Sequence, residues 1–543
     1  LASWRPGRYE LGNFAKNIKK FEAFDMSGNP LPFSKKAKDL WVVKSGGASM
    51  VKVTYSYFAS EINAGSTYVD GKQMYVNPCN CCMYLPARMN EEHVIELDVP
   101  ENFTVATSLK KNGERELHAN HFHELADSPF IASADIKTIS FTAAKLPVHI
   151  HIQGECIPDK EKLIHDFRLF AERQLEFFGG APIDEYHFLF QVLDHKFYHG
   201  VEHLNSTVIA IGPGYHFMHG KTYEDVLGVS CHEMFHLWNI KTIRPAEMLP
   251  YNYTKENYAR TGYVYEGFTT YYGDLLLLQC KIFSQAQYFA TLEERLNKHF
   301  HNWGRFNLSL AESSWDNWLD GYVPGAPYRK VSIYDEGNLV AFMLDVLIMK
   351  NTSNKKSLEN VLKNLYADVG RSGVGYTEED IIRTVNHVAG KDLTEIFTKY
   401  VYGLEGYEIE LQHCFNYLGL EMEKHYSAHY YETHLGFKVT DVAHTKKISL
   451  IAPGSPAWKA GLALNDEIIG INNKHIKNDL NEWLLYFTEK GEKLSVNVVR
   501  GIEMMEINIE VLNEKRFFPH YKIVKELREN TEKASNYAVW SKC

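Results

Sequence analysis

The segment 231–236 reads CHEMFH and places two histidines four positions apart, with a glutamate directly after the first. If this segment is helical, 3.6 residues per turn put His232 and His236 on one face, where both imidazoles can bind the same cation. Glu233 then lies beside the cation and can take a proton from a bound water. Because a catalytic zinc ion needs three protein ligands and an open position, the motif predicts a third ligand elsewhere in the chain.

Glu266 is the candidate for that third ligand. It opens the stretch 266–272, EGFTTYY, which leads into the apolar run 275–278. This pattern predicts a buried helix with a carboxylate in its first turn. Burying a carboxylate is costly unless a charge compensates it, and a zinc ion would do so. We therefore expect one Zn²⁺ per chain, bound by His232, His236 and Glu266. The alternative is a helix with two hydrogen-bonded histidines and a surface glutamate.

Length and composition exclude several classes of protein. A chain of 543 residues is too long for one core and predicts three or four domains. A net charge of −10 argues against non-specific nucleic-acid binding, and no basic run offsets it. No apolar run reaches the roughly 18 residues that a membrane span needs. We expect neither nucleic acid nor membrane as a partner.

The cysteines and the N-terminus bear on the compartment. Eight cysteines are scattered along the chain without the spacing of a disulfide framework. Cys79, Cys81 and Cys82 are clustered, but no further Cys or His follows at zinc-ligand spacing, so a reduced loop is favoured over a metal site. No signal peptide is visible, which favours the cytoplasm. Because the chain begins with Leu1 rather than Met, a periplasmic location stays open.

The hydrophobic pattern changes period along the chain. Up to about residue 155 it alternates with period two, which predicts an all-β region. The segment 159–178 then carries apolar residues at helical spacing. Two strand-like stretches, 186–193 and 206–211, precede the helix of the metal motif. The remainder to about residue 425 is mostly helical in pattern.

After residue 425 short strands return with a distinctive set of turn residues. The segments 454–462 and 465–472 read GSPAWKAGL and NDEIIGIN, and they closely resemble a PDZ domain. In that family a loop, here Leu435, Gly436 and Phe437, points backbone N–H groups at a peptide carboxylate, and the peptide adds as a strand. The resemblance implies a peptide C-terminus as a partner. A PDZ fold that packs on the enzyme and binds nothing is the alternative.

Together these motifs allow a family to be named. The middle of the chain resembles the gluzincin peptidases, such as thermolysin and aminopeptidase N. The whole chain resembles the glycyl aminopeptidase family of bacterial metallopeptidases. The segments 4–9 and 13–17, WRPGRY and NFAKN, resemble the N-terminal β domain of that family, entered partway, which implies missing upstream strands.

The resemblance implies an α+β multidomain chain. Its expected parts are an N-terminal β domain (1–155), a thermolysin-like zinc catalytic domain (156–300), a helical domain (301–425), a PDZ domain (426–515) and a C-terminal tail (516–543).

The same resemblance assigns substrate-binding residues. Gly200, Val201, Glu202 and His203 match the aminopeptidases' Gly-x-Met-Glu-Asn motif, in which the glutamate binds the substrate's free α-amine. An exopeptidase must hold this ammonium group at a fixed distance from the reacting bond, and a carboxylate suits that task. The departure is His203, which replaces the asparagine. An exposed loop acid is the alternative interpretation of Glu202.

A tyrosine is expected to complete the catalytic set. The stretch 334–337, YDEG, resembles the aminopeptidase Tyr-x-Lys-Gly motif, whose tyrosine donates to the oxyanion of the tetrahedral intermediate. Glu336 departs from the lysine of that motif. Tyr271, Tyr272 and Tyr328 are rival candidates for the role of Tyr334.

The sequence therefore predicts a zinc aminopeptidase that removes an N-terminal residue from peptides with a free N-terminus. The resemblance adds a preference for a small residue, Gly or Ala. Glu233 is the expected general base and Tyr334 the expected oxyanion donor. The alternatives are an endopeptidase or other hydrolase on the same scaffold, and a non-catalytic protein that binds peptides through its PDZ domain.

Overall fold

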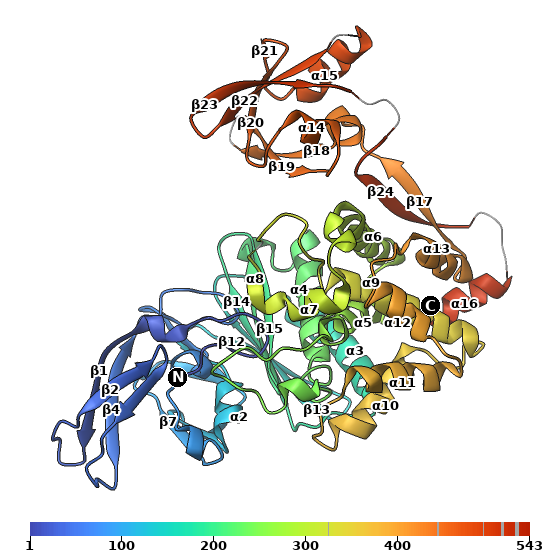
Figure 1. Cartoon of the computed structure of the whole chain (residues 1–543). Coiled ribbons are helices and arrows are strands. Elements are labelled where there is room, and N and C mark those ends of the chain that lie inside the picture. The colour runs from blue at the N-terminus through green and yellow to red at the C-terminus, as the bar shows by residue number, and fades with distance from the viewer. Residues whose placement is uncertain (324, 443–444, 492, 512–514, 527–530, 543) are drawn as a thin grey trace.

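The computed structural model describes residues 1–323, 325–442, 445–491, 493–511, 515–526 and 531–542 (Figure 1). The N-terminal region is built from small antiparallel sheets, in agreement with the period-two pattern. Its strands are β1 (Ile18–Asp25), β2 (Phe33–Ala37), β3 (Leu40–Val43), β4 (Val51–Tyr57), β5 (Tyr68–Val69), β6 (Gln73–Val76), β7 (His93–Glu96), β8 (Thr104–Thr107), β9 (Lys110–Asn112), β10 (Glu116–Ala119) and β11 (Phe130–Ser133), with the short helices α1 (Pro78–Cys81) and α2 (Phe122–Ala126) between them.

A five-stranded sheet forms the base of the middle region. Its strand order is β12-β13-β14-β16-β15, with β13, β14 and β16 parallel to one another. The bounds are β12 (Lys137–Ala143), β13 (Leu146–Gln153), β14 (Tyr186–Val192), β15 (Phe197–Glu202) and β16 (Ser206–Gly212). This sheet joins strands from both sides of the domain boundary expected at residue 155.

Both faces of the sheet are covered, so β14 and β16 are buried along their whole length. On one face Phe188 packs against Phe167 of helix α3 (Lys160–Phe178), with ring centroids 5.0 Å apart. On the other face Leu189 and Val208 pack with Tyr75 and Ile131 of the N-terminal region. The sheet therefore has a helix side and a side that faces the N-terminal strands.

The helix of the metal motif is α4 (Gly220–Phe235), and His236 lies at its C-terminal end. The segment of Glu266 is a π-helical turn, η5 (Tyr263–Phe268), that continues into α5 (Thr269–Gln279). The sequence predicted a plain helix here. Single π turns inside helices are frequent at functional sites, because they re-aim a side chain.

The helices expected from the sequence between residues 286 and 402 are present, with ends shifted by a few residues. They are α6 (Gln285–His301), α9 (Asp335–Asn351), α10 (Leu358–Leu365), α11 (Glu378–Ala389) and α12 (Thr394–Tyr400), to which the structure adds α7 (Leu310–Trp315), α8 (Asn317–Asp320) and α13 (Glu408–Tyr417). Within the described ranges, no helix has the length and apolar character to cross a membrane. The seven cysteines in these ranges are all free.

A C-terminal β domain follows, beyond a pair of antiparallel strands (Figure 1). Its elements are β18 (Phe437–Val442), β19 (Thr445–Ile451), α14 (Pro456–Ala460), β20 (Glu467–Ile471), β21 (Lys474–His475), α15 (Leu480–Glu489), β22 (Leu494–Arg500) and β23 (Glu503–Ile509). The chain enters along β17 (Leu420–Tyr426) and returns along its partner β24 (Pro519–Lys525). The last helix, α16 (Thr531–Ser541), then packs on α5, where Trp540 Nε1 donates to Tyr271.

Two glycines let the η5 turn approach α9 closely. A Cβ atom built on Gly267 would lie 2.3 Å from the Cα of Gly337, closer than real Cβ contacts allow. Gly267 follows Glu266, and Gly337 lies one turn after Tyr334. This backbone contact therefore sets the spacing between two of the predicted site residues.

We predict that Gly267→Ala lowers the free energy of unfolding by about 1–3 kcal/mol, because the added methyl group overpacks a backbone contact. The shift of η5 should also weaken metal binding through Glu266. Gly228→Ala is the matched control: Gly228 lies in α4 with open space where its Cβ would be, so alanine should raise stability there. Thermal melts and bound-metal analysis measure both effects. Equal stability of the Gly267→Ala variant and the wild type would contradict the prediction.

Candidate active site

The structure brings His232, His236 and Glu266 together. The two Nε2 atoms of the histidines lie 3.0 Å apart. Glu266 Oε2 lies 3.4 Å from Nε2 of His236 and 3.6 Å from Nε2 of His232. Glu266 and His236 are almost fully buried. The helical spacing of the two histidines and the buried acid thus meet at one point, as the sequence predicted.

Asn239 holds this group in place, although no sequence motif marked it as a site residue. Its carbonyl oxygen lies 2.6 Å from Nδ1 of His236, so the ring can donate there and keep the lone pair of Nε2 free. The Asn239 side chain donates to the Val264 carbonyl in η5, and Thr269 donates to the Asn239 carbonyl. The end of α4 and the start of α5 are therefore fixed relative to each other.

The donor atoms fit a zinc ion. A tetrahedral ion bound about 2.0–2.1 Å from each nitrogen holds its ligand atoms roughly 3.3 Å apart, and the three observed distances lie around this value. Burial acts to raise the pKa of Glu266, but the two neighbouring imidazoles, His236 foremost, outweigh it and hold the pKa at about 2. The acid is therefore ionised, as a metal ligand must be.

Glu233 lies in the same group and is free to move a proton. Its Oε2 is buried and makes no hydrogen bond to any described residue. Burial, followed by the charges of Glu202 and Glu266, raises the pKa of Glu233 well above its usual range, against the opposing effect of His236. A Cβ atom on Gly200 would lie 2.2 Å from Glu233 Oε1, so a glycine is required at that point of β15.

Glu202 lies near Glu233 and His236, with ligand atoms of all three within 4.8 Å of one another. It is only 3% exposed, so it is not a loop acid in solvent. Gly7 of the N-terminal segment covers it, and a Cβ there would lie 2.7 Å from Glu202 Oε2. Burial raises the pKa of Glu202. Two buried carboxylates this close favour binding of a further cation.

Val201 and His203, expected beside Glu202 in the substrate motif, place their side chains elsewhere. Val201 packs on the opposite face of the sheet, with Leu189 and Val208, because side chains alternate along a strand. His203 is buried, and its Nδ1 lies 3.1 Å from Asp127. Neither side chain lines the cleft that contains Glu202 and Glu233.

Tyr334 is the candidate oxyanion donor that lines this cleft, and its ring centroid lies 6.5 Å from that of His232. Its hydroxyl is 3.3 Å from that of Tyr322. The rivals point elsewhere: Tyr271 donates to Asp345, and Tyr328 donates to the Ile451 carbonyl. Tyr272 packs in the core against Phe177 and Phe235. Glu336, the departure from the motif, is buried and paired with His299.

The cleft has a volume of about 570 Å³. It extends from Gly7 and the predicted metal ligands to a charged end that the sequence analysis did not identify. There Arg295 pairs with Asp274 and Asp335 at 2.9 and 2.8 Å. The loop 243–262 contributes residues to a neighbouring cleft.

The loop proposed to bind a peptide carboxylate lies at the start of β18. Leu435 and Phe437 are buried in the core of the C-terminal β domain. Gly436 donates its backbone N–H to the Tyr431 carbonyl, so this donor is already used. Peptide binding at this loop stays a prediction.

A buried ion pair lies next to the C-terminal end of β15. Lys241 Nζ lies 2.7 Å from Asp127 Oδ1, and His203 shares the same carboxylate. Burial acts to raise the pKa of Asp127, but Lys241 and then His203 hold it far below its usual range. The pair thus anchors residues next to Glu202.

We predict that Lys241→Met lowers the free energy of unfolding by about 3–5 kcal/mol, because it leaves Asp127 buried without its cation. The double variant Lys241→Met/Asp127→Asn should recover part of this loss. The pKa of Asp127 is lowered in the folded state, so the stability that its charge contributes is lost as pH falls. The difference in free energy of unfolding between the wild type and Lys241→Met should therefore narrow below pH of about 4. Denaturant titrations at several pH values measure this. Equal stability of the single and double variants at neutral pH would be inconsistent with the pairing.

Sequence models of three families match the chain: the M61 glycyl aminopeptidase at residues 225–340, the peptidase M61 N-terminal domain at residues 1–134, and the PDZ domain at residues 417–511. Comparison with curated proteins finds no match. Among solved structures, an aminopeptidase N family protein from Idiomarina loihiensis is similar, with 24% identity and a TM-score of 0.89 over 99% of this chain and 94% of that one. This likeness shows a shared fold. An M1 zinc metallopeptidase from Deinococcus radiodurans shares 13% identity and a TM-score of 0.44 over 74% of this chain and 92% of that one.

Proposed function

Because the chain belongs to the M61 glycyl aminopeptidase family of zinc metallopeptidases, we propose that it removes the N-terminal residue from peptides with a free α-amine. The observation that carries this proposal is that Glu202 and Glu233 lie within one cleft beside the three predicted metal ligands. In such a cleft Glu202 can bind the α-amine of the substrate, and Glu233 can accept a proton from the attacking water. The preference for an N-terminal Gly or Ala is part of the proposal and rests on the family.

His232, His236 and Glu266 would hold one zinc ion through the donor atoms described above. When bound, zinc supplies Lewis acidity, which acidifies water and polarises a peptide carbonyl. Glu233 takes the proton from the attacking water, a role that fits its place in the cleft and its carboxylate oxygen without a hydrogen-bond partner among the described residues. It then delivers this proton to the leaving nitrogen of the peptide.

Tyr334 and Glu202 act on the two ends of the first residue. The Tyr334 hydroxyl donates a hydrogen bond to the oxygen that becomes negative in the tetrahedral intermediate, an interaction that can contribute about 3–4 kcal/mol to catalysis. Glu202 accepts hydrogen bonds from the substrate ammonium, which neutralises part of the charge of the two buried carboxylates. An ammonium held there fixes the first peptide bond beside Glu233.

We predict that Glu233→Gln keeps bound zinc at the wild-type level and lowers kcat by at least about 10²–10⁴-fold, because proton transfer contributes that much to such reactions. The variant preserves size and removes only the basic group. Metal content and hydrolysis of an alanine p-nitroanilide measure the two effects. Hydrolysis at the wild-type rate by the zinc-loaded variant would remove Glu233 from the mechanism.

We further predict that Glu202→Gln weakens hydrolysis of peptides with a free N-terminus far more than that of the same peptides with an acetylated N-terminus. The lost interaction is a charge-assisted hydrogen bond to the ammonium, so kcat/KM for free peptides should fall by about 10–10²-fold. Lys196→Gln is a control at an exposed position just before the same strand and outside the residues that line the cleft. Equal losses on free and acetylated peptides would indicate an endopeptidase.

A further inference from the structure

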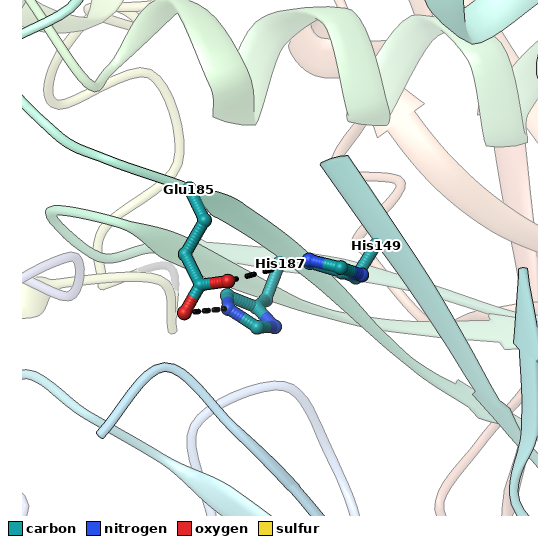
Figure 2. A group of neighbouring side chains, drawn as sticks. All are labelled: His149, Glu185 and His187. Atoms are coloured by element: carbon teal, nitrogen blue, oxygen red, sulfur yellow. Dashed lines mark ion pairs between the residues drawn. The ribbon is translucent and has the colours of Figure 1, made fainter. Parts of the chain in front are cut away.

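A second group of metal-binding side chains lies outside the cleft. Figure 2 shows the Glu185 carboxylate reaching between the imidazoles of His149 and His187. Glu185 Oε2 lies 3.3 Å from Nε2 of His149, and Glu185 Oε1 lies 3.4 Å from Nε2 of His187. The potential ligand atoms of all three residues lie within 4.8 Å of one another. These are two imidazoles and one carboxylate, the same donor types as in the active site.

The sheet itself brings these residues together. His149 of β13 and His187 of β14 are direct register partners on adjacent parallel strands, so their side chains project from the same face. Glu185 comes two residues before His187 and shares that face because side chains alternate. Backbone pairing inside the sheet sets the positions of His149 and His187, and Glu185 lies in the segment directly before β14.

The far nitrogen of each imidazole already has a partner. Nδ1 of His149 lies 2.8 Å from the Ser140 hydroxyl, which can accept its proton. Nδ1 of His187 lies 3.2 Å from Nε2 of His151, and Nδ1 of His151 lies 3.1 Å from the Thr138 hydroxyl. With protons on the Nδ1 atoms, both Nε2 lone pairs face the carboxylate. Metal-binding histidines are held in this way by hydrogen bonds from the ring nitrogen that does not bind.

The two distances between Nε2 and the carboxylate oxygens exceed the length of a short charge-assisted hydrogen bond and match the spacing of ligand atoms around a metal ion. A charge-assisted N–H···O bond is about 2.7–2.9 Å long, whereas ligand atoms around a tetrahedral zinc ion lie about 3.3 Å apart. Nε2 of His187 is buried and makes no hydrogen bond to any residue in the described ranges. The His187 side chain is 8% exposed, and its Nε2 lies 3.4 Å from the Glu185 carboxylate.

We propose that His149, Glu185 and His187 bind a second divalent ion of the zinc class. Imidazole nitrogen and carboxylate oxygen suit this class of ion, and three protein ligands leave a position for water. The side chains of His149 and Glu185 are 25% and 48% exposed, which leaves a route for the ion from solvent.

This second site is distinct from the active site and lies on the other face of the sheet. Phe188, Thr207 and Glu202 form one row of paired positions across β14, β16 and β15, on the helix side. His187 is the neighbour of Phe188 and therefore projects to the opposite side. An ion there links β13 to β14 and stabilises the sheet that carries Glu202. The proposal does not depend on the peptidase activity.

The test is the number of zinc ions bound by the full chain after equilibrium dialysis. The wild type should bind two, and Glu266→Gln, which disables the predicted catalytic site, should retain one. Glu185→Gln and His149→Gln should each lose the second ion and keep the first. Asp184→Asn is the matched control: it removes an exposed neighbouring acid that is not part of the group of potential ligands.

A second measurement reports on structure without activity. In the Glu266→Gln background, zinc should raise Tm, and this rise should disappear when Glu185→Gln is added. Equal Tm values in chelator with and without Glu185→Gln would show that the variant folds. The proposal is overturned if Glu266→Gln protein binds no zinc, or if Glu185→Gln and His149→Gln keep both ions.

Discussion

The interaction on which the active site depends is the burial of the Glu266 carboxylate against two imidazoles. A buried carboxylate costs several kcal/mol unless opposite charge compensates it. The fold places Glu266 on a π-helical turn, and the Asn239 carbonyl fixes the ring of His236 that faces it. The packing of α4 against η5 and α5 therefore brings a buried carboxylate and two imidazoles together, which is a donor set for a divalent cation.

Close backbone contacts bring the other acids to this point. Gly200 leaves room for Glu233 against β15, and Gly7 leaves room for Glu202 beneath the N-terminal segment. At each contact the space for the carboxylate exists because a side chain is missing from the facing strand or loop. The N-terminal region is thus part of the candidate active site, although it contributes none of the predicted metal ligands. Its contribution is the wall that buries Glu202.

The sequence predicted those features that depend on local spacing. The pairing of His232 with His236 could be predicted because helical geometry places residues four apart on one face. The PDZ turns could be recognised from the residues that form them. The placement of Gly7 over Glu202 depends on contacts between distant segments, and no local pattern encodes it. The cluster of His149 with His187 was missed for the same reason: the alternation was visible, but the register of β13 with β14 was not.

The strand pair β17 and β24 gives the PDZ domain an unusual relation to the rest of the chain. Both connections to the domain pass through this one ribbon, so the domain is an insertion between two neighbouring strands, and the chain beyond it returns to place Trp540 beside Tyr271. The catalytic body is therefore completed only after the PDZ domain has been synthesised. During translation, the last helix that seals the core of the enzyme emerges behind a domain that can already have folded.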